Sequence, residues 1–175
     1  MKRNFEEYSS VRGCTYVLLC LVVIILAVVV YRTRLLRSED QILEEFLLTQ
    51  SPEIQQVDVL ILTCGRITPK IIERIKERDT PKRKYMIAFL GAVKARQGIH
   101  QLRRLVEDPS ETVGIRTDSL RAMGAIDSAV ALALAERHLG EGGEFSEICG
   151  AYIDSEILPI PSRGFWDAFW FKGHR

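Results

Sequence analysis

The chain has 175 residues, of which 47% are hydrophobic, and a formal net charge of +1. This length has room for one membrane span and one modest soluble domain. Hydrophobic and charged residues are both unevenly distributed, and their order along the chain indicates its organisation.

The first element is an apolar segment, since Gly13 to Tyr31 contains no charged residue. At about 1.5 Å per residue, a helix of this length covers most of a bilayer core about 30 Å thick. We therefore predict an N-terminal tail over residues 1–13 and a single transmembrane helix over residues 14–31. Its flanking arginines are Arg12 on one side and Arg32, Arg34 and Arg37 on the other. The positive-inside rule thus leaves the orientation undecided.

A cleaved leader is the competing interpretation of this segment. A secretory signal peptide needs a shorter apolar region and small residues at its cleavage site, whereas this segment ends in Val30, Tyr31 and Arg32. Neither Cys14 nor Cys20 follows a sequence that resembles a lipobox. We therefore expect the segment to remain as an anchor.

A short juxtamembrane helix is expected next, within residues 32–50. Ser38 and Gln41 have the spacing of a capping box at a helix start. Ile42, Leu43 and Phe46 then form an apolar stripe with helical periodicity.

Residues 51–140 read as paired helices. Ser51-Pro52, Thr68-Pro69 and Thr80-Pro81 each place a hydroxyl before a proline, which is typical of a helix start. Asp127 is predicted to cap a further helix, and Gly140 is a predicted helix stop. We find no convincing alternating strand pattern and no hairpin turn pair.

The helices also repeat at intervals near 30 residues. Gly65, Gly91 and Gly124 occupy equivalent places at the end of a first helix, and each is followed by a second helix. Arg83 and Arg116 each precede their glycine by eight residues. A repeat of this length is typical of stacked helix pairs.

The residues from Ile115 to Ile126 closely resemble the first helix of a HEAT-like repeat, and those from Lys82 to Val93 are similar. The resemblance is to the short bacterial type also found in phycobilisome-lyase-like proteins. It covers about Ser51 to Leu139 and is weaker in the first unit, where Val57 replaces the arginine. It implies an all-α fold, with a short HEAT-like α-solenoid of about three helix pairs after the anchor. An irregular helical bundle remains the alternative.

No catalytic, cofactor-binding or metal-binding constellation is found in the sequence. His100 and His138 belong to no His-Glu pair of the kind that HEAT-like metal oxygenases carry, and no phosphate loop or nucleophile turn occurs. Cys64 has no histidine partner placed by the sequence, so we interpret it as a packed core residue. The resemblance leaves a bilin-lyase-like enzyme open, but no residue specifically supports it.

Charge is segregated in the second half of the chain. Residues 66–104 contain twelve Lys or Arg against three Asp or Glu, and residues 105–175 contain six against twelve. We predict a positive surface that attracts an acidic protein or anionic lipid headgroups, with nucleic acid ranked lower because no reading motif is present. Its candidate residues are Arg66, Lys70, Arg74, Lys82, Arg83, Lys84, Arg96, Arg103 and Arg104. A solvated charged face is the alternative.

Residues 141–175 are predicted to form a short helix and an aromatic tail. The prolines near Ile160 favour an extended segment from Ile157 to Pro161. The aromatic residues after this segment are Phe165, Trp166, Phe169, Trp170 and Phe171. Such a cluster is costly to expose, so it should pack on the last repeat, lie at the membrane interface or dock into a partner.

The leading functional hypothesis is a non-enzymatic scaffold or adaptor. A single-pass anchor would hold the helical repeats at a membrane, expected to be a bacterial inner or plasma membrane, where they bind a protein or a membrane complex. An accessory subunit, packed through its own span inside a larger assembly, is the second hypothesis, although the span lacks small-residue packing motifs. An enzyme is the third.

Overall fold

The computed structural model describes residues 19–29, 37–48, 50, 57–63 and 65–164. Within these ranges every element of regular secondary structure is a helix, and no strand occurs. The all-α prediction is therefore confirmed for the described residues. The chain divides into two compact units, residues 1–38 and residues 39–175.

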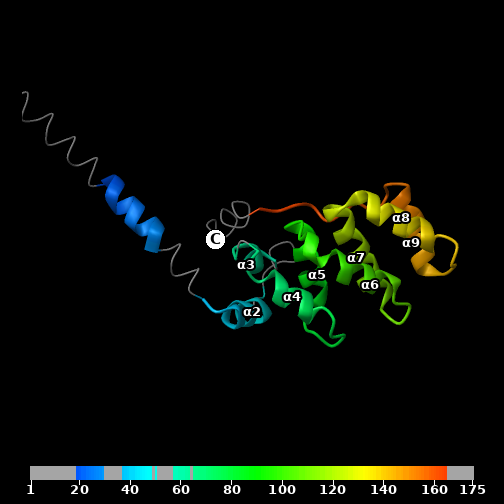
Figure 1. Cartoon of the computed structure of the whole chain (residues 1–175), viewed down its shortest axis with the longest axis horizontal. Coiled ribbons are helices and arrows are strands. Elements are labelled where there is room, and N and C mark those ends of the chain that lie inside the picture. Colours follow the sequence, from blue (N-terminus) through cyan, green and yellow to red (C-terminus); the bar gives the residue numbers. More distant parts are fainter. Residues whose placement is uncertain (1–18, 30–36, 49, 51–56, 64, 165–175) are drawn as a thin grey trace, which may run out of the picture. The chain divides into compact units, whose positions relative to one another are not determined.

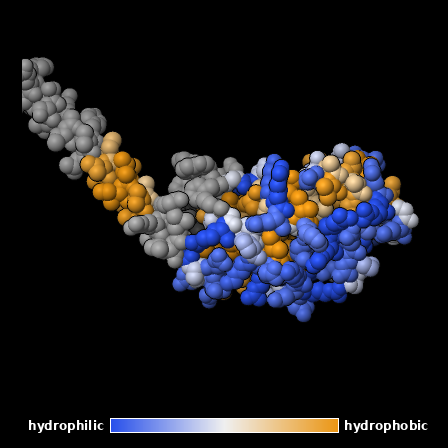
Figure 2. All heavy atoms as spheres, in the orientation of Figure 1, coloured by the Kyte–Doolittle hydropathy of each residue, from blue (hydrophilic) through white to orange (hydrophobic). Residues whose placement is uncertain are grey.

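In the first unit the structure describes residues 19–29, which form a helix, and residues 37–38. Its large apolar side chains are exposed, with 62% of Leu19 and 59% of Ile24 accessible, and Figure 2 shows this stretch as uniformly hydrophobic. Within the described part of the chain, none of the helices has the length and apolarity that a bilayer crossing needs. The tail over residues 1–13 and both ends of the span predicted over residues 14–31 lie outside the described residues.

The second unit consists of successive short helices (Figure 1). They are α2 (Glu39–Leu48), α3 (Asp58–Ile61), α4 (Thr68–Arg74), α5 (Arg83–Ala92), the 3₁₀ turn η2 (Arg96–Gly98), α6 (Ile99–Glu107), α7 (Val113–Ile126), α8 (Ser128–His138) and α9 (Glu144–Ile153). The predicted juxtamembrane helix is α2. It belongs to this unit because Ile42, Leu43 and Phe46 enter the common core and α2 contacts α3.

Helix starts agree with the predicted signals only in part. Asp127 caps α8, since its carboxylate accepts a hydrogen bond from the Val130 N–H at 3.2 Å. Thr68 and Pro69 stand at the start of α4, but Thr68 is the first helical residue and no side chain caps the helix. Thr80 caps nothing: its hydroxyl donates to the Arg74 carbonyl, and α5 begins only after Lys82, which has a left-handed backbone.

The helices alternate between two roles. α5, α7 and α9 contact one another in sequence, and each of the helices α6 and α8 packs against a neighbouring helix of this series. Phe89 and Leu90 of α5 and Met123 of α7 are completely buried. Each such side chain contributes about 1.5–3 kcal/mol to stability through removal from water.

Two glycines bring these helices close together. A Cβ added to Gly91 on α5 would lie 2.9 Å from Cα of Ala122 on α7, and one added to Gly124 on α7 would overlap the Tyr152 hydroxyl oxygen on α9. Gly91 thus permits a close approach between the backbones of α5 and α7, whereas Gly124 makes room for the end of the Tyr152 side chain of α9. Gly65 serves a different purpose, because it lies in a connection with a positive φ of 81°.

A C-terminal strap, residues 157–164, runs back across the unit after α9 (Figure 1). The Ile160 N–H donates to the Arg121 carbonyl on α7 at 3.2 Å, and the Arg163 N–H donates to the Ala92 carbonyl on α5 at 3.0 Å. Arg163 Nη1 then lies 2.7 Å from Asp58 Oδ1 on α3. Residues 158–161 form no helix, in agreement with the prediction, whereas Ile157 still belongs to the turn after α9, where its N–H donates to the Ala151 carbonyl at 3.2 Å. The path of the strap spans the unit from α9 to α3.

Candidate interaction site

The structure does not collect the nine predicted basic residues into one free positive surface. Arg83 is 6% exposed and belongs to the interior, so its assignment to a surface is wrong. The reason is local: α5 places Arg83 against the end of α4, where its Nε donates to the Ile75 carbonyl at 2.7 Å. Its two Nη atoms bind both carboxylate oxygens of Glu111 at 2.8 and 2.9 Å.

Arg116 on α7 makes the same kind of hydrogen bond as Arg83 on α5. Its Nε donates to the Val106 carbonyl at the end of α6 at 2.8 Å, and the residue is 8% exposed. Its guanidinium carbon lies 3.7 Å from the centre of the Phe145 ring. The matched spacing of Arg83 and Arg116 in the sequence therefore corresponds to one structural role, the closure of the preceding helix end.

Other predicted basic residues connect α2 to its neighbours. The Lys70 ammonium forms an ion pair with Asp40. The Lys82 ammonium donates to the Phe46 carbonyl at 2.9 Å and lies 5.3 Å from the centre of the Phe46 ring. Burial lowers the pKa of Lys82. Both contacts are intramolecular, and the charge of Lys70 is compensated by Asp40.

Arg74 and Lys84 are exposed, and Arg66 is half-buried. Arg74 pairs with Glu77 at 3.5 Å. The Lys84 ammonium lies 4.8 Å from the centre of the Tyr85 ring. The charge of Arg74 is therefore partly compensated within its own segment.

A basic stripe remains along the outward side of η2 and α6. We call it the α6 basic face and define it as the exposed residues Arg96, His100, Arg103 and Arg104. Arg103 pairs with Glu107 at 2.9 Å. Among the described residues, no hydrogen bond or ion pair engages the side chains of Arg96 and Arg104. Figure 2 shows mostly hydrophilic residues over α4 and α6 on the visible side of this unit.

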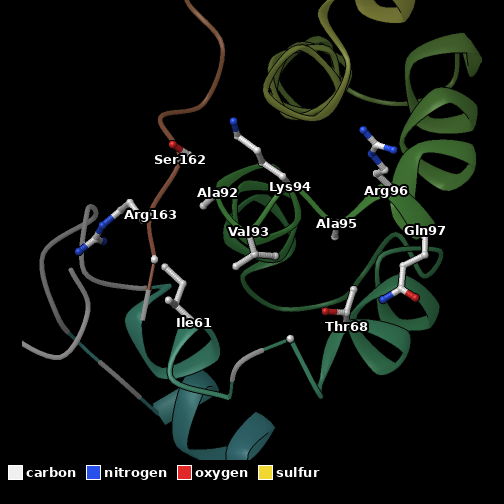
Figure 3. A pocket seen from close by; sticks show the side chains of 12 residues that line it. Ile61, Thr68, Ala92, Val93, Lys94, Ala95, Arg96, Gln97, Ser162 and Arg163 are labelled. Carbon is white, nitrogen blue, oxygen red and sulfur yellow. The ribbon is translucent and has the colours of Figure 1, made fainter. Parts of the chain in front are cut away.

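A hollow of about 810 Å³ lies between α3, the start of α4, the α5–α6 connection and the strap (Figure 3). Ile61, Ala92 and Val93 give it an apolar part, while Thr68 and Gln97 add polar groups. The side chains of Lys94 and Arg96 extend away from the centre of this hollow in Figure 3. Gly164, the last described residue of the strap, also lines it.

A second hollow, of about 350 Å³, lies along the strap itself. Tyr85 and Ala88 of α5, Asp118 and Arg121 of α7, and Ile160 of the strap line it. The strap therefore occupies part of the surface that α5 and α7 would otherwise present.

Of the histidines that the structure describes, His138 is buried and His100 is exposed. His138 is buried at the end of α8, where Nδ1 lies 2.7 Å from Glu141 Oε2 and the ring packs edge-on against Phe145 at 5.7 Å. This contact with His138 is the main cause that lowers the pKa of Glu141. His100 is exposed on the α6 basic face, and His174 lies outside the described residues. No group of three metal-ligating side chains occurs in the described ranges.

Cys149 is buried on α9, and burial raises the pKa of its thiol to about 11. The thiol is thus protonated at neutral pH and is a poor nucleophile. Cys64, which the sequence suggested as a core residue, and the five aromatic residues of the tail lie outside the described residues.

Sequence reasoning missed the pairing of Arg163 with Asp58, which are 12% and 8% exposed at their side chains. The two residues are far apart in the chain, and each looks like an ordinary surface charge. The prolines of the strap were the available signal, because they indicate an extended segment but not its direction. No family model, no curated protein and no solved structure matches the chain.

Proposed function

We propose that the chain is a membrane-anchored, non-enzymatic scaffold whose HEAT-like array of helix pairs binds a protein partner. The supporting observation is the repetition of one set of contacts. Arg83 and Arg116 each donate from Nε to a carbonyl at the end of the preceding helix, and each stands eight residues before a glycine that faces the next odd-numbered helix. Arrays built by repetition bury little of their surface beyond the contacts between neighbours, and they present extended faces that suit protein recognition.

The anchor is supported by the chemistry of the first unit. Apolar side chains such as Leu19, Ile24 and Ile25 are more than half exposed along the helix over residues 19–29. Exposed apolar surface of this kind is costly in water, at roughly 25 cal/mol per Å². A bilayer around the apolar segment over residues 14–31 removes that cost.

The partner surface is the α6 basic face. Arg96 and Arg104 hold charges that no described carboxylate neutralises, unlike Arg74 and Lys76, which pair with Glu77 and Glu73. An acidic protein surface is the complementary partner, since opposite potentials speed association and fix the register of binding.

The experiment is an affinity pulldown of the full chain from gently solubilised membranes. We expect a distinct protein partner to be recovered with the wild-type chain and with a R74Q/K76Q variant. The R96Q/R104Q variant should recover much less of it, because it removes the same number of charges from uncompensated positions. Recovery of the monomer alone across several detergents would contradict the scaffold. Equal losses in both variants would remove the α6 basic face from the proposal.

A further inference from the structure

We propose that α5 and α7 form a peptide-binding groove, which the strap occupies in cis and which a partner protein fills in trans with an extended segment. The partner segment has a large apolar residue between two prolines and an arginine two places after the second proline, the pattern that Pro159 to Arg163 follow in the strap. The inference goes beyond the proposed function, because it needs neither the membrane anchor nor any residue of the α6 basic face.

Two glycines make the floor of this groove. A Cβ added to Gly91 on α5 would lie 3.3 Å from the Ile160 Cβ, and one added to Gly124 on α7 would lie 3.5 Å from the Pro159 Cβ. Strap residues therefore lie directly over both glycines. Because glycine has no side chain, an extended backbone can lie close against both helices at these two points.

Polar groups beside the glycines fix the direction and register of the strap. Arg121 contributes twice, since its carbonyl accepts from the Ile160 N–H at 3.2 Å and its Nε donates to the Leu158 carbonyl at 2.9 Å. Further along, the Ala92 carbonyl accepts from the Arg163 N–H at 3.0 Å. Main-chain bonds of this kind hold an extended peptide regardless of its sequence, so selectivity must come from side chains.

Asp58 selects for arginine at the α3 end of the groove. Its Oδ1 lies 2.7 Å from Arg163 Nη1, and the two side chains are 8% and 12% exposed. A charge-assisted contact that is nearly buried favours an arginine at this place, because an uncharged residue would deprive the carboxylate of this cation.

The strap covers the groove only lightly. Ile160 and Arg163 are partly buried, whereas most of the strap is exposed: Leu158, Pro159, Pro161, Ser162 and Gly164. A segment with so little burial opens at a small cost in free energy. The helices beneath it contain fully buried residues such as Leu90 and Met123, so they keep their shape when the strap leaves.

Unfilled space beside the strap gives a partner segment the means to displace it. The strap competes at a high effective concentration, of the order of mM, because it belongs to the same chain. A partner therefore needs an additional contact. The hollow of about 350 Å³ borders Ile160, and Tyr85 and Ala88 line it from α5. An aromatic side chain in place of Ile160 can enter this hollow and bury more apolar area, which strengthens binding.

Fluorescence anisotropy tests the groove with a fluorescein-labelled peptide of residues 157–164 that carries I160F, added to the full chain in detergent. We expect the R163A chain to bind this peptide at least about tenfold more tightly than the wild-type chain, because its strap loses the contact with Asp58 and competes less. The R137A chain is the control, since it loses an exposed arginine paired with Glu107. It should bind as the wild-type chain does, with unchanged far-UV circular dichroism in both variants. Equal affinities of the R163A and R137A chains would overturn occupation of the groove by the strap.

Variants of the peptide test recognition without any further change to the chain. Toward the R163A chain, the I160F peptide should bind several-fold more tightly than the native peptide. Peptides with I160D or R163A should bind at least about tenfold more weakly than the native peptide. A benzophenone side chain in place of Ile160 should cross-link to α5 or α7. Four peptides of equal affinity, or cross-links elsewhere in the chain, would overturn the inference.

Discussion

Arg83 on α5 and Arg116 on α7 make the same buried bond to the end of the preceding helix, yet their remaining partners differ. The Arg83 guanidinium forms a bidentate ion pair with Glu111, whose side chain is only 5% exposed. Arg116 lies 3.9 Å from Glu141, whose side chain is 54% exposed, and stacks on Phe145 instead. The feature that the two sites share is the bond from Nε to the end of the preceding helix. The second partner differs because each arginine meets a different later segment of the chain.

Substitution of Arg83 should destabilise the fold more than substitution of Arg116. We expect R83L to lower the free energy of unfolding by about 3–5 kcal/mol, because it removes the bidentate partner of the buried Glu111 carboxylate and leaves only Arg78, at 3.7 Å, as a cation beside it. R83L/E111L should recover much of this loss, since a buried ion pair can be replaced by apolar residues at little cost. Urea unfolding of the full chain in detergent, monitored by far-UV circular dichroism, measures both. If R83L/E111L were no more stable than R83L, the buried Glu111 carboxylate would not be the cause of the destabilisation.

Removal of Arg116 should lower the free energy of unfolding by a smaller amount. We expect R116L to lower the free energy of unfolding by about 1–3 kcal/mol, through loss of the bond to the Val106 carbonyl and of the stack on Phe145. Adding E141Q should recover little, because the Glu141 side chain already reaches water. The same urea experiment provides the measurement. If R116L were as costly as R83L, burial of the acidic partner could not be what separates the two sites.

The paired glycines extend the comparison to the packing between helices. We expect G91A to cost about 1–3 kcal/mol, because its Cβ would meet the backbone of Ala122 on α7. G124A should cost less, since the group in its way is the end of the Tyr152 side chain, which can rotate. G114A on α7 is the control, with no atom within 4 Å of the added Cβ. Thermal unfolding of the three variants ranks them, and a G91A chain as stable as G114A would contradict the close approach.

The smallest expected effect is a dependence of stability on pH that arises from Glu141, beside Arg116. The contact with His138 holds the pKa of Glu141 below its ordinary value of 4.5. A carboxylate with a lowered folded-state pKa stabilises the fold above its unfolded-state pKa, and this contribution is lost as the pH falls through the folded-state pKa. We therefore expect the stability difference between wild type and E141Q to shrink below about pH 4.5. Urea midpoints measured across this range test it, and a difference that stays constant would argue against the assignment to Glu141.

Much of the helical organisation could be predicted from local signals. The apolar stripe of Ile42, Leu43 and Phe46 indicated α2, and Asp127 indicated the start of α8. The prolines of the strap indicated an extended backbone. Such signals succeed because capping, periodicity and proline geometry act between residues that are close in the chain.

The candidate site was harder to predict. A count of Lys and Arg between residues 66 and 104 indicated a positive surface, but it could not separate the buried Arg83 from the exposed Arg96. It also could not show that Asp40 neutralises Lys70. Partners of long side chains are chosen by packing, so charge counts overestimate the charge that is free to attract another molecule.

The sequence by itself was enough to predict that the described residues are helical, and it shows that an apolar segment precedes the helices. Only the tertiary structure decided that Glu111 closes Arg83, that Gly91 admits α7, and that Arg163 returns to Asp58 on α3. The reason is the range of the interactions. Backbone hydrogen bonds and caps act over a few residues, whereas the burial of a charge becomes favourable only when packing has brought its distant partner into place.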